Sequence, residues 1–423
     1  MFDDTLQKFL LTYRDFRMKI LEPILAWREE IAALRRDIHA HPELAFEEFR
    51  TADLVAQRLQ DWGIDVDRGL GGTGVVGIIK GKQAGPRAVG LRADLDALPM
   101  QEINTFAHAS QHGGKMHACG HDGHTAMLLG AARYLVAQHR DFAGTVYVIF
   151  QPAEEGGGGA KRMIDDGLFT RFPMDAVFGM HNWPGMRAGQ FGVTAGPIMA
   201  SANEFVIRIT GKGTHAGMPH LGVDPVMTAV QLAQSLQTII TRNRAPLEAA
   251  VLSITQIHTG SADNVVPNDA EMRGTVRTFT LETLDLIERR MEEIARHTCA
   301  AMNCDLEFEF MRNYPPTINH AAETAFAVEV MRDIVGQDNV FDKVTPTMGA
   351  EDFAFMLQEK PGCYVWIGNG SGDHRDAGHG AGPCMLHNGS YDFNDELIPL
   401  GATYWSQLAL KWLAQPAAPQ TAA

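Results

Sequence analysis

The side chains most able to do chemistry together lie in one short run, residues 116–124, which reads MHACGHDGH. The run places Cys119 and His121 two residues apart, with glycine between them and again at position 123. This spacing can turn a thiolate and an imidazole toward one point, as a site for a divalent metal ion requires. Taken alone, the run is equally typical of a polar loop with scattered histidines.

Carboxylates and a further histidine directly follow three other segments that have the character of buried strands. In chain order these residues are Asp94, Asp96, Glu154, Glu155 and His181. Ligands bind outside the carboxyl ends of the strands in an open α/β sheet, so we expect these side chains along one rim. His387, from the C-terminal part, is expected to join them. Each residue alone fits a solvated turn, but together they predict a metal site.

Two other motifs carry less weight. Glycines of residues 72–77 have the spacing of a dinucleotide-binding loop, but they precede a strand and do not open a helix. His39 and His41 would suit a metal pair, but their place at a helix end favours a cap or a packing role.

The sequence around these residues predicts the elements that position them. Apolar periodicity indicates helices over residues 2–35 (with a break near Pro23), 51–62, 123–139, 321–335, 350–358 and 394–413. Short apolar runs indicate strands at 75–79, 88–91, 146–150, 176–180 and 363–367. Buried-type strands that alternate with helices predict an α/β fold with a largely parallel sheet.

The character of the sequence changes near Pro197. From there to Pro315, strands are expected at 203–210, 249–257, 270–279 and 304–310, and helices at 224–243 and 281–301. This β-α-β-β-α-β order is ferredoxin-like. We therefore expect a discontinuous first domain, residues 1–197 and 314–423, interrupted by an inserted α+β domain, residues 198–313.

Composition excludes several classes of protein. The chain has 36 Lys and Arg against 51 Asp and Glu, a net charge of −15, which argues against nucleic acid or an anionic membrane as a partner. Five cysteines without a Cys-x-x-Cys pair predict neither a disulfide framework nor a redox motif. We find no apolar run of membrane-spanning length and expect no signal peptide, so a cytoplasmic protein is predicted.

Seven motifs occur in a specific order along residues 30–412. They are LRRDIHAHPEL (34–44), RADLDALP (92–99), HACGHDGH (117–124), QPAEEG (151–156), GMH (179–181), GTHAGMPH (213–220) and LHN (386–388). The chain thereby resembles the M20 metallopeptidases, and within them the amidohydrolase branch of hippurate hydrolases, N-acyl-amino-acid amidohydrolases and auxin-conjugate hydrolases. The resemblance implies a two-metal, aminopeptidase-like catalytic domain with an inserted lid and dimerisation domain, hence a homodimer or a higher homo-oligomer.

The resemblance also assigns roles to residues by position. The implied metal ligands are Cys119, His121, Glu155, His181 and His387. Glu154 matches the general base, and His215 matches a lid histidine that helps to hold the substrate carbonyl. Asn264 and Arg277 resemble lid residues near the substrate carboxylate, and Asp94 lies where a carboxylate can orient a ligand. The peptidase branches place His and Asp ligands where this chain has Arg92 and the Cys119/His121 pair, so their specificity does not transfer.

These implications predict a hydrolase that cleaves the amide bond of small N-acyl amino acids, with hippurate-like substrates favoured. Two divalent ions would polarise the carbonyl and acidify a water, whose proton Glu154 would take. A thiolate ligand favours Zn²⁺, with Mn²⁺, Co²⁺ and Ni²⁺ as alternatives. The nearest rival is a dipeptidase or aminopeptidase of the same fold. A non-catalytic metal-binding protein would not need Glu154, and a redox thiol enzyme would need a cysteine pair.

Overall fold

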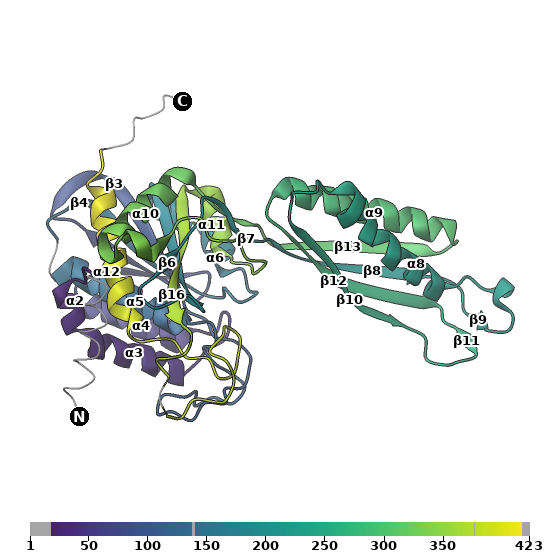
Figure 1. The fold of residues 1–423 in the computed structure, drawn as a ribbon, viewed down its shortest axis with the longest axis horizontal. Coiled ribbons are helices and arrows are strands. Elements are labelled where there is room, and N and C mark those ends of the chain that lie inside the picture. Colours follow the sequence, from purple (N-terminus) through teal and green to yellow (C-terminus); the bar gives the residue numbers. More distant parts are fainter. Residues whose placement is uncertain (1–17, 138–139, 376, 417–423) are drawn as a thin grey trace. The chain divides into compact units, whose positions relative to one another are not determined.

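The computed structural model describes residues 18–137, 140–375 and 377–416, and the chain divides into two compact units (Figure 1). Unit 1 comprises Met1–Gly196, Asn319–Thr345 and Phe355–Ala423. Unit 2 comprises Pro197–Ile318 and Pro346–Ala354. The short second segment of unit 2 lies outside the range 198–313 that the sequence suggests for an inserted domain.

Unit 1 is built on an eight-stranded sheet of order β1-β2-β4-β3-β5-β16-β6-β15. Its strands are β1 (Asp65–Leu70), β2 (Gly74–Lys80), β3 (Gln83–Asp94), β4 (Ala143–Gln151), β5 (Ala176–Pro184), β6 (Phe191–Gly192), β15 (Val340–Phe341) and β16 (Gly362–Gly370). The four central strands β4, β3, β5 and β16 run parallel, whereas β1 and β2 pair antiparallel at one side. The predicted α/β class with a mostly parallel sheet is confirmed.

The helices of unit 1 are α2 (Glu22–Ala26), α3 (Arg28–Ala40), α4 (Phe49–Asp61), α5 (His121–Ala137), α6 (Gly159–Asp165), α7 (Leu168–Arg171), α10 (Ala321–Val335) and α12 (Leu397–Leu413), with α11 (Phe353–Glu359) starting at the border of the units. Helices α5 and α12 pack against each other and against β3, and α3 packs on α5 (Figure 1). Both α5 and α12 are therefore buried along most of their length.

The N-terminal helix expected over residues 2–35 differs from the observed one. Its residues 2–17 lie outside the described residues. The break falls at Trp27, between α2 and α3, and not at Pro23. Pro23 occupies the first turn of α2, where a proline is tolerated because no helical partner exists for its missing N–H.

Unit 2 contains a four-stranded antiparallel sheet of order β10-β12-β8-β13. Its elements are β8 (Ala202–Thr210), α8 (Pro225–Thr238), β10 (Ala250–Thr259), β12 (Asp269–Thr278), α9 (Leu281–Ala301) and β13 (Asp305–Tyr314). Asp224 and Thr280 cap the two helices through their side chains. Both helices share one apolar core with the sheet, so the ferredoxin-like order is confirmed.

Shorter pieces complete the described chain. They are β7 (Gly196–Met199) paired with β14 (Thr317–Asn319), β9 (Thr214–His215) paired with β11 (Val265–Val266), the 3₁₀ turns Pro219–Leu221 and Gln337–Asn339, and a π-helical turn, Ile239–Asn243, that ends the predicted helix 224–243. Among the helices so described, none combines the length and the apolar character that crossing a bilayer requires.

Candidate metal centre and active site

The carboxyl ends of three parallel strands deliver the acidic residues to one rim of the unit 1 sheet. Strand β3 ends at Asp94, β4 leads into the Glu154-Glu155 turn, and β5 contains His181. The backbone N–H of Glu155 donates to Asp96 Oδ2 at 2.9 Å, which links the β3 and β4 ends. The rim expected from the strand ends is thus present.

The turn that carries Cys119 and His121 depends on Gly120. This glycine has φ +95°, and a Cβ there would lie 2.2 Å from the Asn182 side-chain nitrogen and 2.6 Å from the Tyr391 hydroxyl. The tight turn lets α5 begin at His121, two residues earlier than the sequence indicated. As a result, the thiol and the imidazole leave the backbone side by side at the helix start.

Three ligand atoms converge from this turn and from β5. The sulfur of Cys119 lies 3.3 Å from His181 Nε2, and His181 Nδ1 donates to the Asn182 carbonyl at 2.6 Å. His121 Nδ1 donates to the Asp96 carbonyl at 2.9 Å, so in the neutral imidazole that metal binding requires, the lone pair is on Nε2. That Nε2 atom is buried and has no hydrogen-bond partner among the described residues. All three ligand atoms lie within 4.8 Å of one another.

A second group shares the cysteine. His387 Nε2 lies 3.1 Å from Glu155 Oε1, and the ligand atoms of Cys119, Glu155 and His387 all lie within 4.8 Å of one another. The backbone N–H of His387, a residue with φ +57°, donates to the Ala118 carbonyl at 2.8 Å. This bond holds the late His387 loop against the cysteine turn, so the structure brings together all five residues predicted as ligands.

Glu154 is buried, with 6% of its surface exposed, and its carboxylate lies within 4.8 Å of ligand atoms of His121 and Glu155. The turn that carries it is held by Glu48, a residue that no motif indicated. Glu48 accepts the backbone N–H of Ala153, which has φ +53°, at 2.9 Å. Burial raises the pKa of Glu48 to about 7.

Asp94 orients a histidine, but the histidine is not one of the predicted ligands. Asp94 accepts hydrogen bonds from His124 Nδ1 and from Arg92, both at 2.7 Å, whereas His121 Nε2 lies 3.7 Å from the Asp94 carboxylate. His124 Nε2 accepts the Asn182 backbone N–H at 3.0 Å. Both nitrogens of His124 therefore have hydrogen-bond partners, and its imidazole links Asp94 at the end of β3 to Asn182 in β5.

Within the described residues, neither His39 nor His41 belongs to a group of side chains that could hold a metal ion. His39 is buried, and its two ring nitrogens contact Asp122 at 2.8 Å and Glu102 at 3.3 Å. The packing role favoured from the sequence fits this arrangement.

Electrostatics at the rim favour a bound cation. Burial opposes charge on His121, but Asp94, Asp96 and Glu155 raise its pKa to about 10. Burial, together with Glu155 and Glu154, raises the pKa of the Cys119 thiol well above its ordinary value. Burial and His124 hold the pKa of His181 well below its ordinary value, so its imidazole is neutral and able to bind metal.

The donor set therefore fits divalent ions. An unpaired buried nitrogen such as His121 Nε2 is costly unless a partner fills its lone pair. Thiolate, imidazole and carboxylate donors together suit ions of the zinc type. A dication would also offset the negative charge that raises the thiol pKa.

The remaining predicted residues belong to unit 2. His215 and Asn264 are both exposed and lie together, because His215 pairs with Val265 and the Asn264 carbonyl accepts the N–H of Ala216 at 2.9 Å. His215 Nδ1 accepts the Gly217 N–H at 3.0 Å, so Nε2 carries the proton and can donate. Arg277 is separate: it lies in β12 and donates to the Thr275 hydroxyl at 2.5 Å.

Residues 90–411 match Peptidase family M20/M25/M40. The chain belongs to this family. It is 40% identical over 398 residues to a hippurate hydrolase of Campylobacter jejuni, covering 94% of this chain and 100% of that protein. Over 386 residues it is 37% identical to an N-acetylcysteine deacetylase of Bacillus subtilis, covering 91% and 97%. Over 405 residues it is 38% identical to thermostable carboxypeptidase 2 of Saccharolobus solfataricus, covering 94% and 99%.

A solved structure agrees with this membership. The Bacillus subtilis YXEP protein, described as a dinuclear metal binding peptidase from the M20 family, superposes with a TM-score of 0.78. The two chains are 33% identical, and the match covers 92% of this M20 chain and 98% of that one. The resemblance to the M20 family that the motifs indicated is confirmed.

Proposed function

We propose that this chain hydrolyses the amide bond of N-acyl amino acids with the help of two divalent metal ions, releasing a carboxylic acid and an amino acid. Its family and relatives such as the hippurate hydrolase and the N-acetylcysteine deacetylase make it an amidohydrolase. One observation carries the metal dependence. Six ligand-type side chains converge on the rim, four of them buried, and His121 Nε2 there has no hydrogen-bond partner within the described chain.

We assign five residues as ligands of the two ions: Cys119, His121, Glu155, His181 and His387. Cys119 belongs to both groups of converging atoms, so its sulfur would help to hold the ions. Ions bound there would polarise the scissile carbonyl and lower the pKa of a water toward neutrality. The dinuclear description of the YXEP protein supports the number two.

Glu154 is assigned as the general base. It accepts a proton from the attacking water and passes that proton to the departing nitrogen. Its carboxylate is close to ligand atoms of His121 and Glu155, as a base acting on water at this rim requires.

The unit 2 residues are assigned to the substrate. His215 would donate from Nε2 to the carbonyl oxygen as negative charge develops there. Asn264 and Arg277 would bind the substrate carboxylate. Asp94 acts behind the rim through His124.

The finer assignments are the acyl group and the metal. Hippurate-like substrates are favoured because the match covers the whole of the hippurate hydrolase and 94% of this chain. Zn²⁺ is favoured because a thiolate contributes to the site, with Mn²⁺, Co²⁺ and Ni²⁺ as alternatives. A cytoplasmic homodimer or higher homo-oligomer is part of the same proposal.

A dipeptidase or aminopeptidase of the same fold is the second candidate, and the carboxypeptidase relative favours keeping it. Purified enzyme should be incubated with N-benzoylglycine, N-acetylcysteine and unblocked glycylglycine, each with Zn²⁺, Mn²⁺, Co²⁺ or Ni²⁺. The proposal expects release of benzoate or acetate and little cleavage of the free dipeptide. Preferential cleavage of the dipeptide would replace the proposal by its rival.

A further inference from the structure

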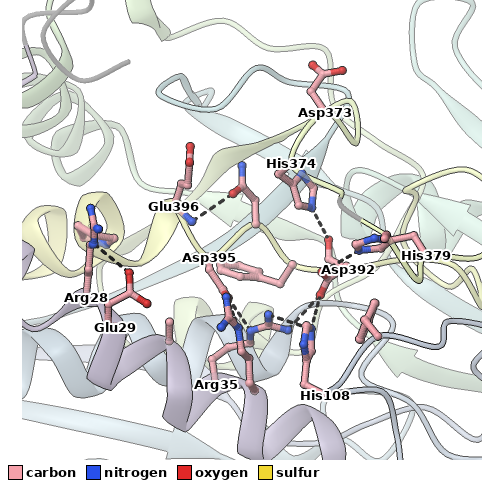
Figure 2. A pocket seen from close by; sticks show the side chains of 17 residues that line it. Arg28, Glu29, Arg35, His108, Asp373, His374, His379, Asp392, Asp395 and Glu396 are labelled. Carbon is pink, nitrogen blue, oxygen red and sulfur yellow. Dashed lines mark hydrogen bonds and ion pairs between the residues drawn. The ribbon is translucent and has the colours of Figure 1, made fainter. Parts of the chain in front are cut away.

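Arg35 is a buried cation near the rim, and its guanidinium contacts four side chains. The residue lies in α3 with 1% of its surface exposed. Its Nε donates to Asp395 at 2.7 Å, and one terminal nitrogen donates to Asp392 at 3.0 Å and contacts Asp122 at 3.3 Å. The other terminal nitrogen lies 3.3 Å from His108 Nε2, which must accept because arginine only donates (Figure 2).

The three carboxylates that contact Arg35 belong to the two segments that carry the assigned ligands. Asp122 directly follows His121 at the start of α5, and Asp392 and Asp395 lie on the loop that begins with His387. One guanidinium fork therefore connects two segments that are far apart in sequence. A planar fork with several fixed donors is suited to this task, whereas a lysine ammonium is a single point charge.

The contact to Asp122 is reinforced from the same helix. His39 Nδ1 lies 2.8 Å from the same Asp122 oxygen, Oδ2, that Arg35 contacts. Asp122 Oδ1 has no hydrogen-bond partner among the described residues. The orientation of Asp122, and with it the first turn of α5, is thus set by two side chains of α3.

The loop on the other side of Arg35 borders a cavity and is also held by contacts of its own. The cavity, of about 610 Å³, is lined by Arg35, His108, His374, His379 and residues 392–396 (Figure 2). Tyr391 and Phe393 are buried in the unit 1 core, and the Asp392 carbonyl accepts a hydrogen bond from Asn369 at 3.2 Å. The hydrogen bonds to Arg35 add a direct link from this loop to α3 and, through Asp122, to the start of α5.

We infer that Arg35 is a positioning residue that holds the His387 loop in register with the Cys119–His121 turn, so that ligands from both segments can bind the same pair of ions. This inference rests on the proposed ligand set. Partners that orient metal ligands affect metal affinity typically by about 10- to 100-fold, without touching the metal.

Cobalt titration of the chelator-treated full-length protein tests the inference. The variants are Arg35→Lys, which keeps the charge, and Asp395→Asn, which removes one acceptor from the loop. Arg133→Met is the control, because Arg133 also joins α5 to α3, through Glu30 at 2.7 Å, but it lies far along α5 from His121 and its described partners Glu30, Trp27 and Trp62 adjoin no assigned ligand. Cobalt bound to a thiolate gives a near-ultraviolet charge-transfer band, and its visible bands report the coordination geometry.

We expect two cobalt equivalents in the wild type and in Arg133→Met. In Arg35→Lys the weaker equivalent should lose about 10- to 100-fold in affinity, with altered visible bands. In Asp395→Asn, the cobalt affinity and the visible bands should change in the same direction as in Arg35→Lys, but by a smaller amount. A purely structural Arg35 would lower the unfolding temperature of the metal-free protein and leave the cobalt spectra unchanged. Spectra and affinities like those of the control in both variants would overturn the inference while the proposed function stands. A wild type that binds cobalt without a thiolate band would overturn both.

Discussion

The residues assigned to chemistry in the two units live in opposite environments. On the unit 1 rim Cys119, His121, Glu154 and His181 are buried, and hydrogen bonds fix ring nitrogens such as His121 Nδ1 and His181 Nδ1. In the two-stranded β9–β11 sheet of unit 2, His215 and Asn264 are exposed and are held mainly through the backbone. Metal ligands need fixed orientation and low dielectric, which burial supplies. A group that meets a substrate must remain reachable.

The strongest test of this contrast removes the metal. Dialysis against a strong chelator should abolish turnover, because the unit 1 rim then lacks the group that polarises the carbonyl. Added divalent ion should restore it. Turnover and metal content would be measured on the same samples, and full activity in a verified metal-free sample would contradict the unit 1 assignment.

The second test separates the two adjacent glutamates of the rim. Glu154→Gln should keep its metal and lose turnover by about 10²- to 10⁴-fold, because it removes the general base. Glu155→Gln should lose metal as well, because it removes a ligand. Elemental analysis of both variants decides the matter. The roles are reversed if Glu154→Gln is the variant that loses metal.

The third test concerns the exposed His215 of strand β9 in unit 2. His215→Ala should lower kcat by about 10²- to 10³-fold at unchanged metal content, as expected for loss of one donor to a developing oxyanion. His258→Ala is the control, since His258 is also an exposed histidine of unit 2. An unchanged kcat in His215→Ala would show that His215 takes no part in the reaction.

The fourth and smallest expected effect concerns stability behind the rim. Burial alone would lower the pKa of His39, but Asp122 and Glu102 raise it from 6.5 to about 9. A raised folded-state pKa stabilises the protein fully below pH 6.5, and this stabilisation is lost as the pH rises through 9. Unfolding temperatures of the wild type and of His39→Gln should therefore differ most near pH 6 and converge toward pH 10. The exposed His297→Gln should show no such convergence.

Local pattern was enough for the central strands and for the residues at their ends. The apolar runs before Asp94, Glu154 and His181 predicted buried strands, and strand direction then predicted a shared rim. The two-residue strands β6 and β15 were missed, because so short a segment carries no periodic signal. The start of α5 was misplaced because the turn at Gly120 depends on its fit against Asn182.

The supporting residues of the site were beyond local pattern for the same reason. Glu48 acts on the Ala153 turn, Tyr391 donates to Asn182 at 2.8 Å, and Asn182 donates to the Cys119 carbonyl at 2.6 Å. Each of these contacts joins segments that only the tertiary fold brings together. The residues assigned to chemistry, in contrast, lie in short motifs such as residues 117–124 and 151–156, which local pattern can indicate.

The place of the insertion has a consequence for biosynthesis. Strand β16 pairs in parallel with β5, yet all of unit 2 is translated between them. At about 5–20 residues per second, β5 waits on the order of ten seconds with an unpaired backbone edge, a template for wrong pairing. If unit 2 folds first, β16 can pair with β5 sooner after it has been translated. The first and last sheet strands of unit 2, β8 and β13, are neighbours, with Tyr314 opposite Ala202, so the departing and returning chain are brought side by side as soon as that sheet forms. A nascent chain whose insert folds slowly should therefore depend on chaperones more than its finished stability would suggest.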